Sequence, residues 1–278
     1  MNEQLKLEKA TYHLYTFLIS KMVGSLGSTV YAFGMSMYIL SLTGSALSFA
    51  MNIILSIVPR TIFSPIAGIL GDRLPRKWLV LGGQAGVFLT IGLLLVYTVT
   101  VDLSLAAIYT ATFFSSIFGS FSSVSFSASI ANLVDEERLQ KAMSYNQLSY
   151  SLSGIGGPIM GGMLFGFVSM EIFLVIYLIA GFITLALEST MNFTLYKKEV
   201  PTNGEKETMF ESLKAGISYV KSKTVIRSIL WTALWLNLFF TCINIGGDFI
   251  LLTLLQLDPQ LIGITEAAGA IGMVVTLS

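Results

Sequence analysis

The sequence predicts an all-α polytopic membrane protein on three grounds. Hydrophobic residues make up 54% of the 278 positions and charged residues only 12%, about half the charged share of a typical soluble domain. The mean hydropathy is +0.77. Long apolar stretches also recur along the whole chain. Because so few polar side chains are present to face water, a soluble enzyme is not expected.

A bilayer core about 30 Å thick requires roughly 20 apolar residues of helix. By that measure eight stretches are predicted to span the membrane: 14–41, 46–70, 77–98, 103–128, 143–167, 171–194, 226–252 and 260–278. Short loops join the first six. We therefore expect a six-helix bundle at 1–195, a cytoplasmic linker at 196–224, and the first two helices of a second bundle at 225–278.

The positions of Lys and Arg predict the orientation. Fourteen of the 16 basic residues fall in segments 1–9, 71–77, 135–141 and 195–227, and none falls in the connections between them on the opposite side. Cytoplasmic loops of membrane proteins are enriched in Lys and Arg. The N-terminus is therefore predicted to be cytoplasmic.

The long linker is predicted to contain an amphipathic helix. Apolar residues recur there at helical spacing, opposite lysines: Phe210, Leu213, Ile217 and Val220 against Lys214, Lys221 and Lys223. Such a helix is typical of a segment lying on the membrane surface. A solvated linker that happens to be periodic is the alternative.

Composition also excludes several kinds of site. Sixteen basic and sixteen acidic residues cancel, which argues against a nucleic-acid binder. The single cysteine, Cys242, and the single histidine, His13, exclude a disulfide framework and a multi-histidine metal site. No catalytic constellation, metal site or cofactor is predicted.

The loop after the second stretch reads Gly68-Ile-Leu-Gly71-Asp72-Arg73-Leu-Pro75-Arg76-Lys77. Glycines at positions 68 and 71 permit close backbone approach, and the proline stops the helix. A carboxylate among three cations suggests a specific pairing or a helix N-terminus to cap. An ordinary cytoplasmic loop is the alternative.

The fifth stretch contains five glycines and a proline between positions 154 and 162. Gly157 and Gly161, four residues apart, form a groove for another helix. Pro158 removes a backbone hydrogen bond and favours a kink. Static packing and a moving hinge are both compatible with this pattern.

These two motifs resemble signatures of the major facilitator superfamily. The loop resembles its Gly-x-Leu-Ala-Asp-Arg-x-Gly-Arg-Lys signature, and the fifth stretch resembles the Gly-Pro-x-x-Gly-Gly signature of its antiporter branch. Residues 42–46 and 57–60 look most like bacterial macrolide-efflux and siderophore-exporter-like members. The resemblance covers the whole chain.

The resemblance implies a twelve-helix transporter whose two bundles rock around a central cavity, so the chain is expected to be about four helices short of that layout. It implies that Asp72, Arg73, Arg76 and Lys77 latch the cytoplasmic side in one state. It also implies that Gly157, Pro158, Gly161 and Gly162 let the fifth helix pack and flex where the bundles meet.

We therefore expect a monomeric secondary transporter in the bacterial plasma (inner) membrane, exporting lipophilic small molecules of macrolide or siderophore type in exchange for protons. Uptake of a small solute and a truncated, non-transporting membrane protein are the alternatives.

The fourth stretch lacks the arginine of the family's proton-coupling signature. It has instead a small polar face that could line a cavity or pack against a helix: Ser115, Ser116, Gly119, Ser122, Ser123 and Ser127.

Apart from those in the first or second position of a span, five charged residues fall inside predicted spans, where each costs free energy. Arg60 is expected to face the cavity, attracting an anionic group or balancing a carboxylate; a structural ion pair is the alternative. Lys21 is expected to snorkel to the cytoplasmic headgroups, and Glu188 to reach water likewise. Asp248 is the predicted proton carrier, and Glu266 lies in the last span.

Overall fold

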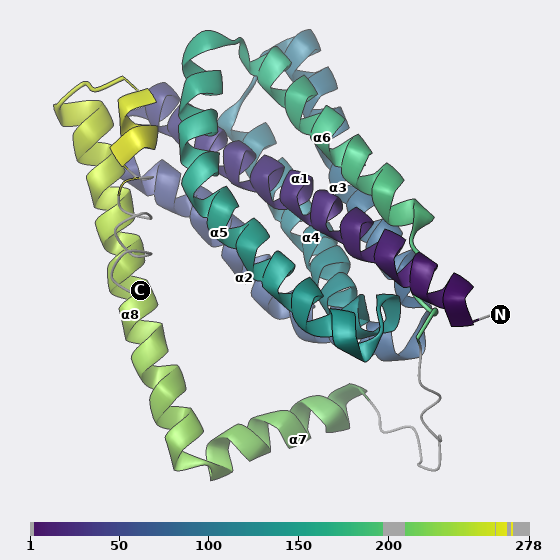
Figure 1. Cartoon of the computed structure of the whole chain (residues 1–278). Helices are drawn as coiled ribbons and strands as arrows, with labels where there is room; N and C mark the ends of the chain where they lie inside the picture. The colour runs from purple at the N-terminus through teal and green to yellow at the C-terminus, as the bar shows by residue number, and fades with distance from the viewer. Residues whose placement is uncertain (1–2, 197–208, 259, 266–267, 269–278) are drawn as a thin grey trace.

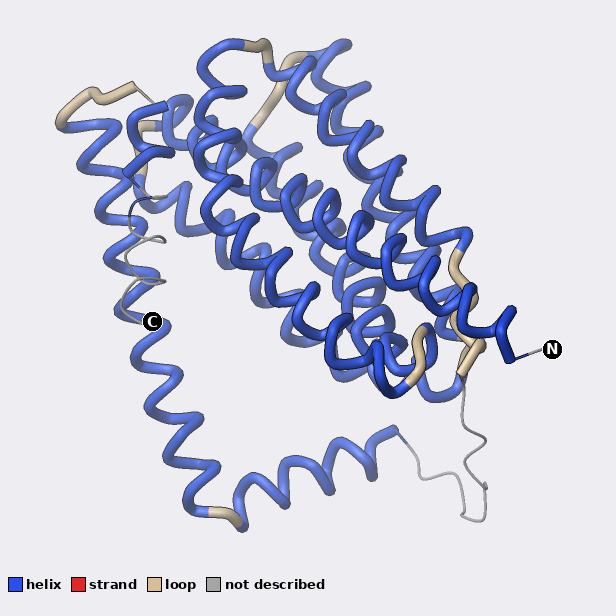
Figure 2. Tube along the Cα trace, in the orientation of Figure 1, coloured by secondary structure: helices blue, strands red, loops and turns tan. Residues whose placement is uncertain are grey.

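The computed structural model describes residues 3–196, 209–258, 260–265 and 268. Every regular element in these ranges is a helix (Figures 1 and 2), which confirms the predicted all-α class. Six helices follow one another through short connections: α1 Glu3–Thr43, α2 Ala46–Arg73, α3 Arg76–Val101, α4 Leu105–Leu133, α5 Glu136–Phe167 and α6 Met170–Thr190. They are followed by α7 Met209–Ser222, α8 Thr224–Phe249 and the π-helical turn η1 Ile250–Leu254.

The sequence explains where these helices begin and end. Gly44 closes α1 with a φ of +58°, a conformation that glycine adopts without strain. The Ser45 side chain then caps α2, accepting from the Ser48 amide at 3.4 Å, and Ser104 caps α4 in the same way. Pro75 separates α2 from α3.

Within the described part of the chain, six helices are long and apolar enough to cross a membrane: Lys6–Thr43, Ala46–Arg73, Arg76–Val101, Leu105–Leu133, Met170–Thr190 and Thr224–Leu254. The 32-residue helix α5 is not one of these. Its first turns carry charged residues and its middle is rich in Ser and Gly, which lowers its hydropathy.

Several predicted boundaries differ from the structure: α1 begins at Glu3 rather than at 14, and α4 ends at Leu133 rather than at 128. Residues 136–141, predicted as loop, form the first turns of α5, whose acidic N-terminal residues favour a helix start. Helix α6 ends at Thr190 rather than at 194. Of the predicted span 260–278, residues 260–265 are helical, and most of the rest lies outside the described residues.

The first six helices form one bundle (Figure 1). Helix α1 packs against α5 and α6, α3 packs against α4 and α6, and α2 packs against α4. Apolar cores lie toward both ends, one around Phe17, Phe126 and Ile130 and one around Met35, Ile39 and Ile91. This arrangement places polar faces of α1, α2 and α4 toward the interior between the two cores.

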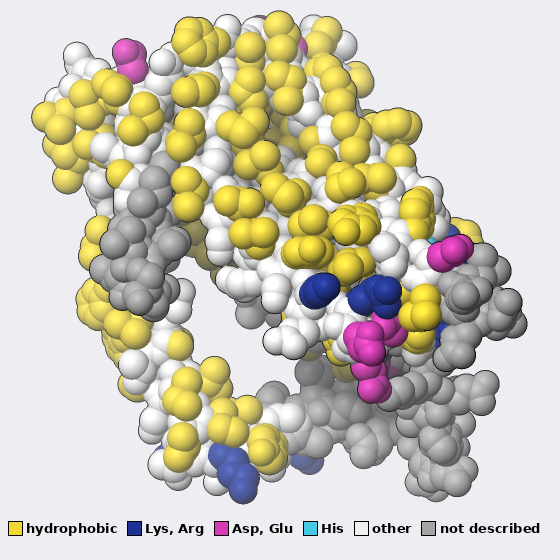
Figure 3. Space-filling model, in the orientation of Figure 1, with side chains coloured by type: hydrophobic (Ala, Val, Ile, Leu, Met, Phe, Trp, Pro, Cys, Tyr) yellow, Lys and Arg dark blue, Asp and Glu magenta, His cyan; other side chains and the backbone are white. Residues whose placement is uncertain are grey.

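Helices α7 and α8 extend away from this bundle (Figure 1). Near its C-terminal end α8 packs Ile245 and Phe249 onto the bundle, while most of its length is exposed and apolar. The predicted linker helix is present as α7, with Lys214 and Lys221 exposed; its position on the membrane surface stays a prediction. On the face drawn in Figure 3, the visible Lys and Arg side chains gather near the N-terminal end of the bundle and on α7.

Candidate functional site

A cavity of about 760 Å³ lies inside the bundle, with walls from all six helices α1–α6. Hydroxyl-bearing side chains dominate its lining, and the aromatic residues Tyr31, Phe126, Tyr150 and Tyr177 complete it. Three charged residues reach the cavity: Lys21, Arg60 and Glu188. The site is therefore a mixed polar and aromatic chamber with charges on its wall.

The small polar face of α4 serves both of the uses left open by the sequence. Five of its six members line the cavity, and Ser127 does not. On another side, α4 packs tightly on α3, where a Cβ on Gly83 would lie 2.7 Å from the Ser122 amide nitrogen. One helix thus supplies a cavity wall and a close-packed interface.

Arg60 lies directly after Pro59 within α2 and lines the cavity, as the sequence predicts. Among the residues that the structure describes, no carboxylate lies within ion-pair distance of its guanidinium. The alternative of an internal structural pair finds no support in this part of the chain. The guanidinium is positioned to meet a solute in the cavity.

Lys21 does not snorkel to the headgroups, contrary to the expectation. Its Nζ lies 4.9 Å from the ring centre of Phe126 and 5.5 Å from that of Tyr150. Ring faces attract cations at such distances. The neighbours of Lys21 therefore turn it into the cavity, although a side chain of that length can reach either way.

Glu188 does not reach bulk water either, and the expectation for it is wrong. The residue is 5% exposed and lines the cavity wall. The Ser20 hydroxyl donates to its Oε1 at 3.2 Å. Its Oε2 is buried and has no hydrogen-bond partner among the described residues.

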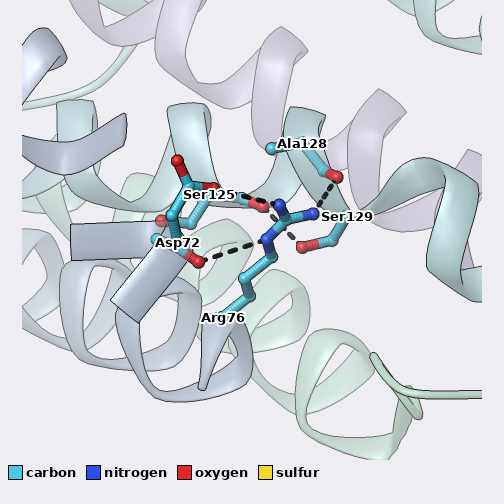
Figure 4. A network of polar contacts seen from close by, with 6 residues as sticks. Asp72, Arg76, Ser125, Ala128 and Ser129 are labelled. Atoms are coloured by element: carbon cyan, nitrogen blue, oxygen red, sulfur yellow. Dashed lines mark hydrogen bonds and ion pairs between the residues drawn. The ribbon is translucent and has the colours of Figure 1, made fainter. Parts of the chain in front are cut away.

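The loop between α2 and α3 is held by Arg76 (Figure 4). Its Nε donates to the Gly71 carbonyl at 3.3 Å, its Nη1 donates to the Ala128 carbonyl near the end of α4, and its Nη2 lies 3.4 Å from Asp72 Oδ1. The Asp72 side chain is 77% exposed. The backbone carbonyls of α2 and α4, more than this solvated carboxylate, therefore fix the guanidinium.

The other members of the loop motif have separate roles. Lys77 donates from Nζ to the Ser189 carbonyl at 2.7 Å and so ties α3 to α6, and Arg73 is the last residue of α2. The expected close backbone approach at Gly68 and Gly71 is wrong. A Cβ would meet nothing within 4 Å at Gly68, and only Ser125 Oγ, at 3.7 Å, at Gly71.

The glycine motif of α5 forms the interface with α1. A Cβ on Gly157 would overlap the Thr29 side chain, and one on Gly161 would lie 3.0 Å from the Val30 carbonyl oxygen. Gly162 is buried as well. On another side of α5, the Pro158 carbonyl lies so close to Gly263 that a Cβ on Gly263 would overlap the Pro158 carbonyl oxygen. The motif therefore joins α5 both to α1 and to segment 260–265.

The two carboxylates that the sequence singles out in the last spans are Asp248 and Glu266. Asp248 is buried in α8, 6% exposed, and is not among the residues that line the cavity. Glu266 lies outside the described residues. Their parts in coupling stay predictions.

The sequence reading missed a buried polar pair inside the cavity. Thr112 Oγ1 of α4 donates to Asn52 Oδ1 of α2 at 2.8 Å, and both residues line the chamber. Asn52 could have been singled out as an amide within a predicted span. Among the described residues, no group of three or more His, Cys, Asp or Glu could hold a metal ion.

Comparison with known proteins gives the same family. The sequence model of the Major Facilitator Superfamily matches residues 17–278. Macrolide efflux protein A of Streptococcus pyogenes is 22% identical over 94% of this chain. An uncharacterized MFS-type transporter of Bacillus subtilis, YfiS, is 26% identical over 95% of it.

The chain spans 64% of the length of the first relative and 62% of the second. Macrolide efflux protein A of Enterococcus faecalis is 22% identical over 84% of this chain and 71% of its own length. A family match over most of the chain, with apolar helices long enough to cross a bilayer, identifies a multi-pass membrane protein. The chain belongs to the major facilitator superfamily, a family of transporters rather than enzymes.

Proposed function

We propose that this protein is a secondary active transporter that exports lipophilic small molecules, of macrolide or siderophore type, in exchange for protons. It would act as a monomer in the bacterial plasma membrane, with its N-terminus cytoplasmic. The observation that carries the proposal is the cavity of about 760 Å³ enclosed by α1–α6. Ligand pockets in proteins span roughly 300–1,000 Å³, so the chamber is large enough for a drug-sized solute.

The chemistry of the cavity wall supports lipophilic cargo with polar groups. Aromatic rings from α1, α4, α5 and α6 offer flat apolar surfaces, and hydroxyls from α1, α2 and α4 offer hydrogen bonds. Two relatives carry names that describe macrolide efflux. We extend that activity to this chain as the proposal.

The contacts of the two motifs suggest how the cavity would change access. In the proposed arrangement, residues 1–195 move as one bundle against a second bundle, and residues 225–278 form the start of that second bundle. Asp72, Arg73, Arg76 and Lys77 would latch the cytoplasmic side in one state. Within the first bundle, Arg76 on the ends of α2 and α4 and Lys77 on α6 would hold this loop in place. The close contact of Pro158 with Gly263 would be part of the surface on which the two bundles turn.

A direct test is accumulation of a labelled macrolide and of a lipophilic dye in cells that express the chain. We expect lower accumulation than in cells without it, and recovery on adding a protonophore. Accumulation above the control would favour uptake. Accumulation equal to the control for every compound, with the chain present in the membrane, would contradict transport by this chain.

Arg60 provides a test of the cavity itself. Replacing Arg60 with Gln removes the charge but keeps a polar side chain on the cavity wall, so we expect transport of an anionic solute to fall while the protein stays folded. Thr61→Ser is the matched control, because it changes the neighbouring residue on the cavity wall while keeping its hydroxyl and altering no charge. Unchanged transport by Arg60→Gln would refute the part proposed for this residue.

A further inference from the structure

Glu188 is the carboxylate among the cavity-lining residues of the described chain. It lies near the C-terminal end of α6, is 5% exposed, and has one oxygen bonded to the Ser20 hydroxyl while the other is buried without a hydrogen-bond partner among the described residues. An ionised carboxylate in an apolar region is costly unless it is paired and hydrogen-bonded. If this carboxyl group is ionised, its Oε2 therefore has no hydrogen bond from the described residues to stabilise the charge.

Lys21 lines the cavity wall together with Glu188, whose Oε1 accepts from the hydroxyl of the neighbouring Ser20. It follows Ser20 in α1, and its ammonium lies over the rings of Phe126 and Tyr150. No ion pair joins Lys21 to Glu188, since their charged atoms are further apart than 4.0 Å. The cation is held by aromatic rings beside the carboxyl group rather than locked to it.

The other titratable groups around this end of α6 come from three helices. Helix α1 contributes the buried His13, and Tyr12, whose hydroxyl donates to Thr190 Oγ1. Helix α3 contributes Lys77, which is occupied by the Ser189 carbonyl. Helix α5 contributes Tyr150, beneath Lys21. Of these basic groups, Lys21 lines the same cavity as Glu188, and Arg60 of α2 is the other basic residue on the cavity wall.

We propose that Glu188 is the residue that carries the coupling proton, with Lys21 as its counter-charge. This inference rests on the proposed proton-driven export. The step is a proton transfer alone: an O–H bond forms on the carboxylate with a proton from cavity water, and the same bond breaks when the proton leaves on the other side. The neutral acid satisfies the buried carboxyl group without Lys21, whereas the carboxylate draws on the ammonium beside it.

This geometry differs from that of a static structural pair. A pair that serves only folding gains most from direct contact and full hydrogen bonding, and both are missing here. It also differs from that of Asp248, which does not line the cavity and already has an interaction partner. A carrier must be reachable from the cavity and free to change its protonation, and Glu188 meets both conditions.

The test uses the purified full chain in liposomes of bacterial polar lipid. Export of a labelled macrolide is driven by a pH gradient in one assay, and exchange of labelled for unlabelled macrolide is measured at equal pH in the other. We expect E188Q to lose the first and keep the second, and E188D to regain part of the first. E171Q, at the opposite end of the same helix and outside the cavity lining, is the matched control and should keep both.

A second measurement does not depend on transport. Dicyclohexylcarbodiimide modifies protonated carboxyl groups shielded from bulk water, so mass spectrometry of the purified chain should find Glu188 modified at low pH and progressively less at higher pH. The Lys21→Gln variant should show a changed pH dependence at the same residue. In E188Q this modification should be lost.

The outcomes separate the two proposals. Wild-type liposomes that exchange and export nothing would contradict the proposed function, while pH-dependent modification of Glu188 would still support a proton site there. Gradient-driven export that survives in E188Q, or the absence of modification at any pH, would overturn the assignment of Glu188 even with transport intact. Loss of both export and exchange in E188Q with a lowered unfolding temperature would indicate a structural residue and also overturn it.

Discussion

Two helix interfaces in the bundle depend on glycine, and they differ in what the missing side chain makes room for. Between α3 and α4 the backbones themselves meet: a Cβ on Gly83 would lie 2.6 Å from the Phe118 carbonyl oxygen and 2.7 Å from the Ser122 nitrogen. Between α1 and α5, a Cβ on Gly157 would overlap the side chain of Thr29 instead, and the backbone of α1 comes no nearer than 3.0 Å, at the Val30 carbonyl oxygen beside Gly161. A side chain can turn aside or be shortened, whereas two packed backbones can separate only by moving whole helices.

The two interfaces also have different surroundings. Another face of α4 lines the cavity, so the α3–α4 interface positions a wall of the site. Another face of α5 meets segment 260–265 through Pro158 and Gly263. The α3–α4 interface therefore supports the shape of the chamber, while the α1–α5 interface lies where motion between the bundles is proposed.

The largest effect is expected from Gly83→Leu. The added side chain has no space, because the atoms it would meet belong to the backbone of α4. Overpacking costs about 1–3 kcal/mol where neighbours can adjust, and we expect the upper end of that range or more here. Thermal unfolding of the purified chain would measure it.

The control for Gly83 is its immediate neighbour. A Cβ on Gly82 would meet nothing within 4 Å, so Gly82→Leu should leave the unfolding temperature close to that of the wild type. Equal destabilisation by the two variants would show that helix propensity or membrane insertion, rather than close packing of backbones, makes glycine necessary in this part of α3.

Gly157→Ala is expected to cost about 1–3 kcal/mol, because Thr29 must move. Adding Thr29→Gly removes the atoms that the new methyl group would meet, so the double variant should lose less stability than the sum of the two single changes. Gly154→Ala is the matched control, since a Cβ there would meet nothing within 4 Å. Strict additivity of the two changes would refute the contact as the cause.

These glycines also show what the sequence could predict. The spacing of Gly157 and Gly161 predicts a groove for another helix, and the structure places α1 there. The sequence does not show that a Cβ on Gly154 would meet nothing within 4 Å. Nor does it show that Gly83, outside the motif of α5, is packed about as tightly as Gly157. The need for glycine depends on the neighbouring helix, which spacing within one helix does not contain.

The cavity was predictable to a similar degree. Hydropathy located its helices, and the small polar residues of α4 indicated a wall. The directions of Lys21 and Glu188 were not predictable. Lys21 lies about two turns into the predicted span 14–41 and Glu188 near the end of α6, and from either position a long side chain can reach the headgroups or the interior. Packing of α1 against α6 decided between the two, through Ser20 on one helix and Glu188 on the other.

Arg76 tests whether polar contacts add to the α3–α4 interface. Its guanidinium joins the ends of α2 and α4 through carbonyl oxygens, and a lysine at this position cannot donate in both directions with the same geometry. We expect Arg76→Lys to cost about 1–3 kcal/mol in thermal unfolding. Asp72→Asn should cost less than about 1 kcal/mol, because the Asp72 side chain is largely exposed and exposed ion pairs contribute little. The reverse order would make the ion pair the main support of the loop.

The smallest effect is expected from Ser153→Ala in the α1–α5 interface. The hydroxyls of Ser25 and Ser153 lie 2.7 Å apart, yet the one Ser25 proton also has an acceptor in the Lys21 carbonyl at 2.6 Å, with the Ser149 carbonyl at 3.3 Å. Removing the Ser153 hydroxyl therefore leaves no partner unsatisfied, and the loss should stay at or below about 1 kcal/mol. If Ser153→Ala destabilises the chain as much as Gly157→Ala in the same unfolding assay, the α1–α5 interface depends on its hydrogen bond rather than on close packing. The two interfaces would then differ in polarity and not in steric fit.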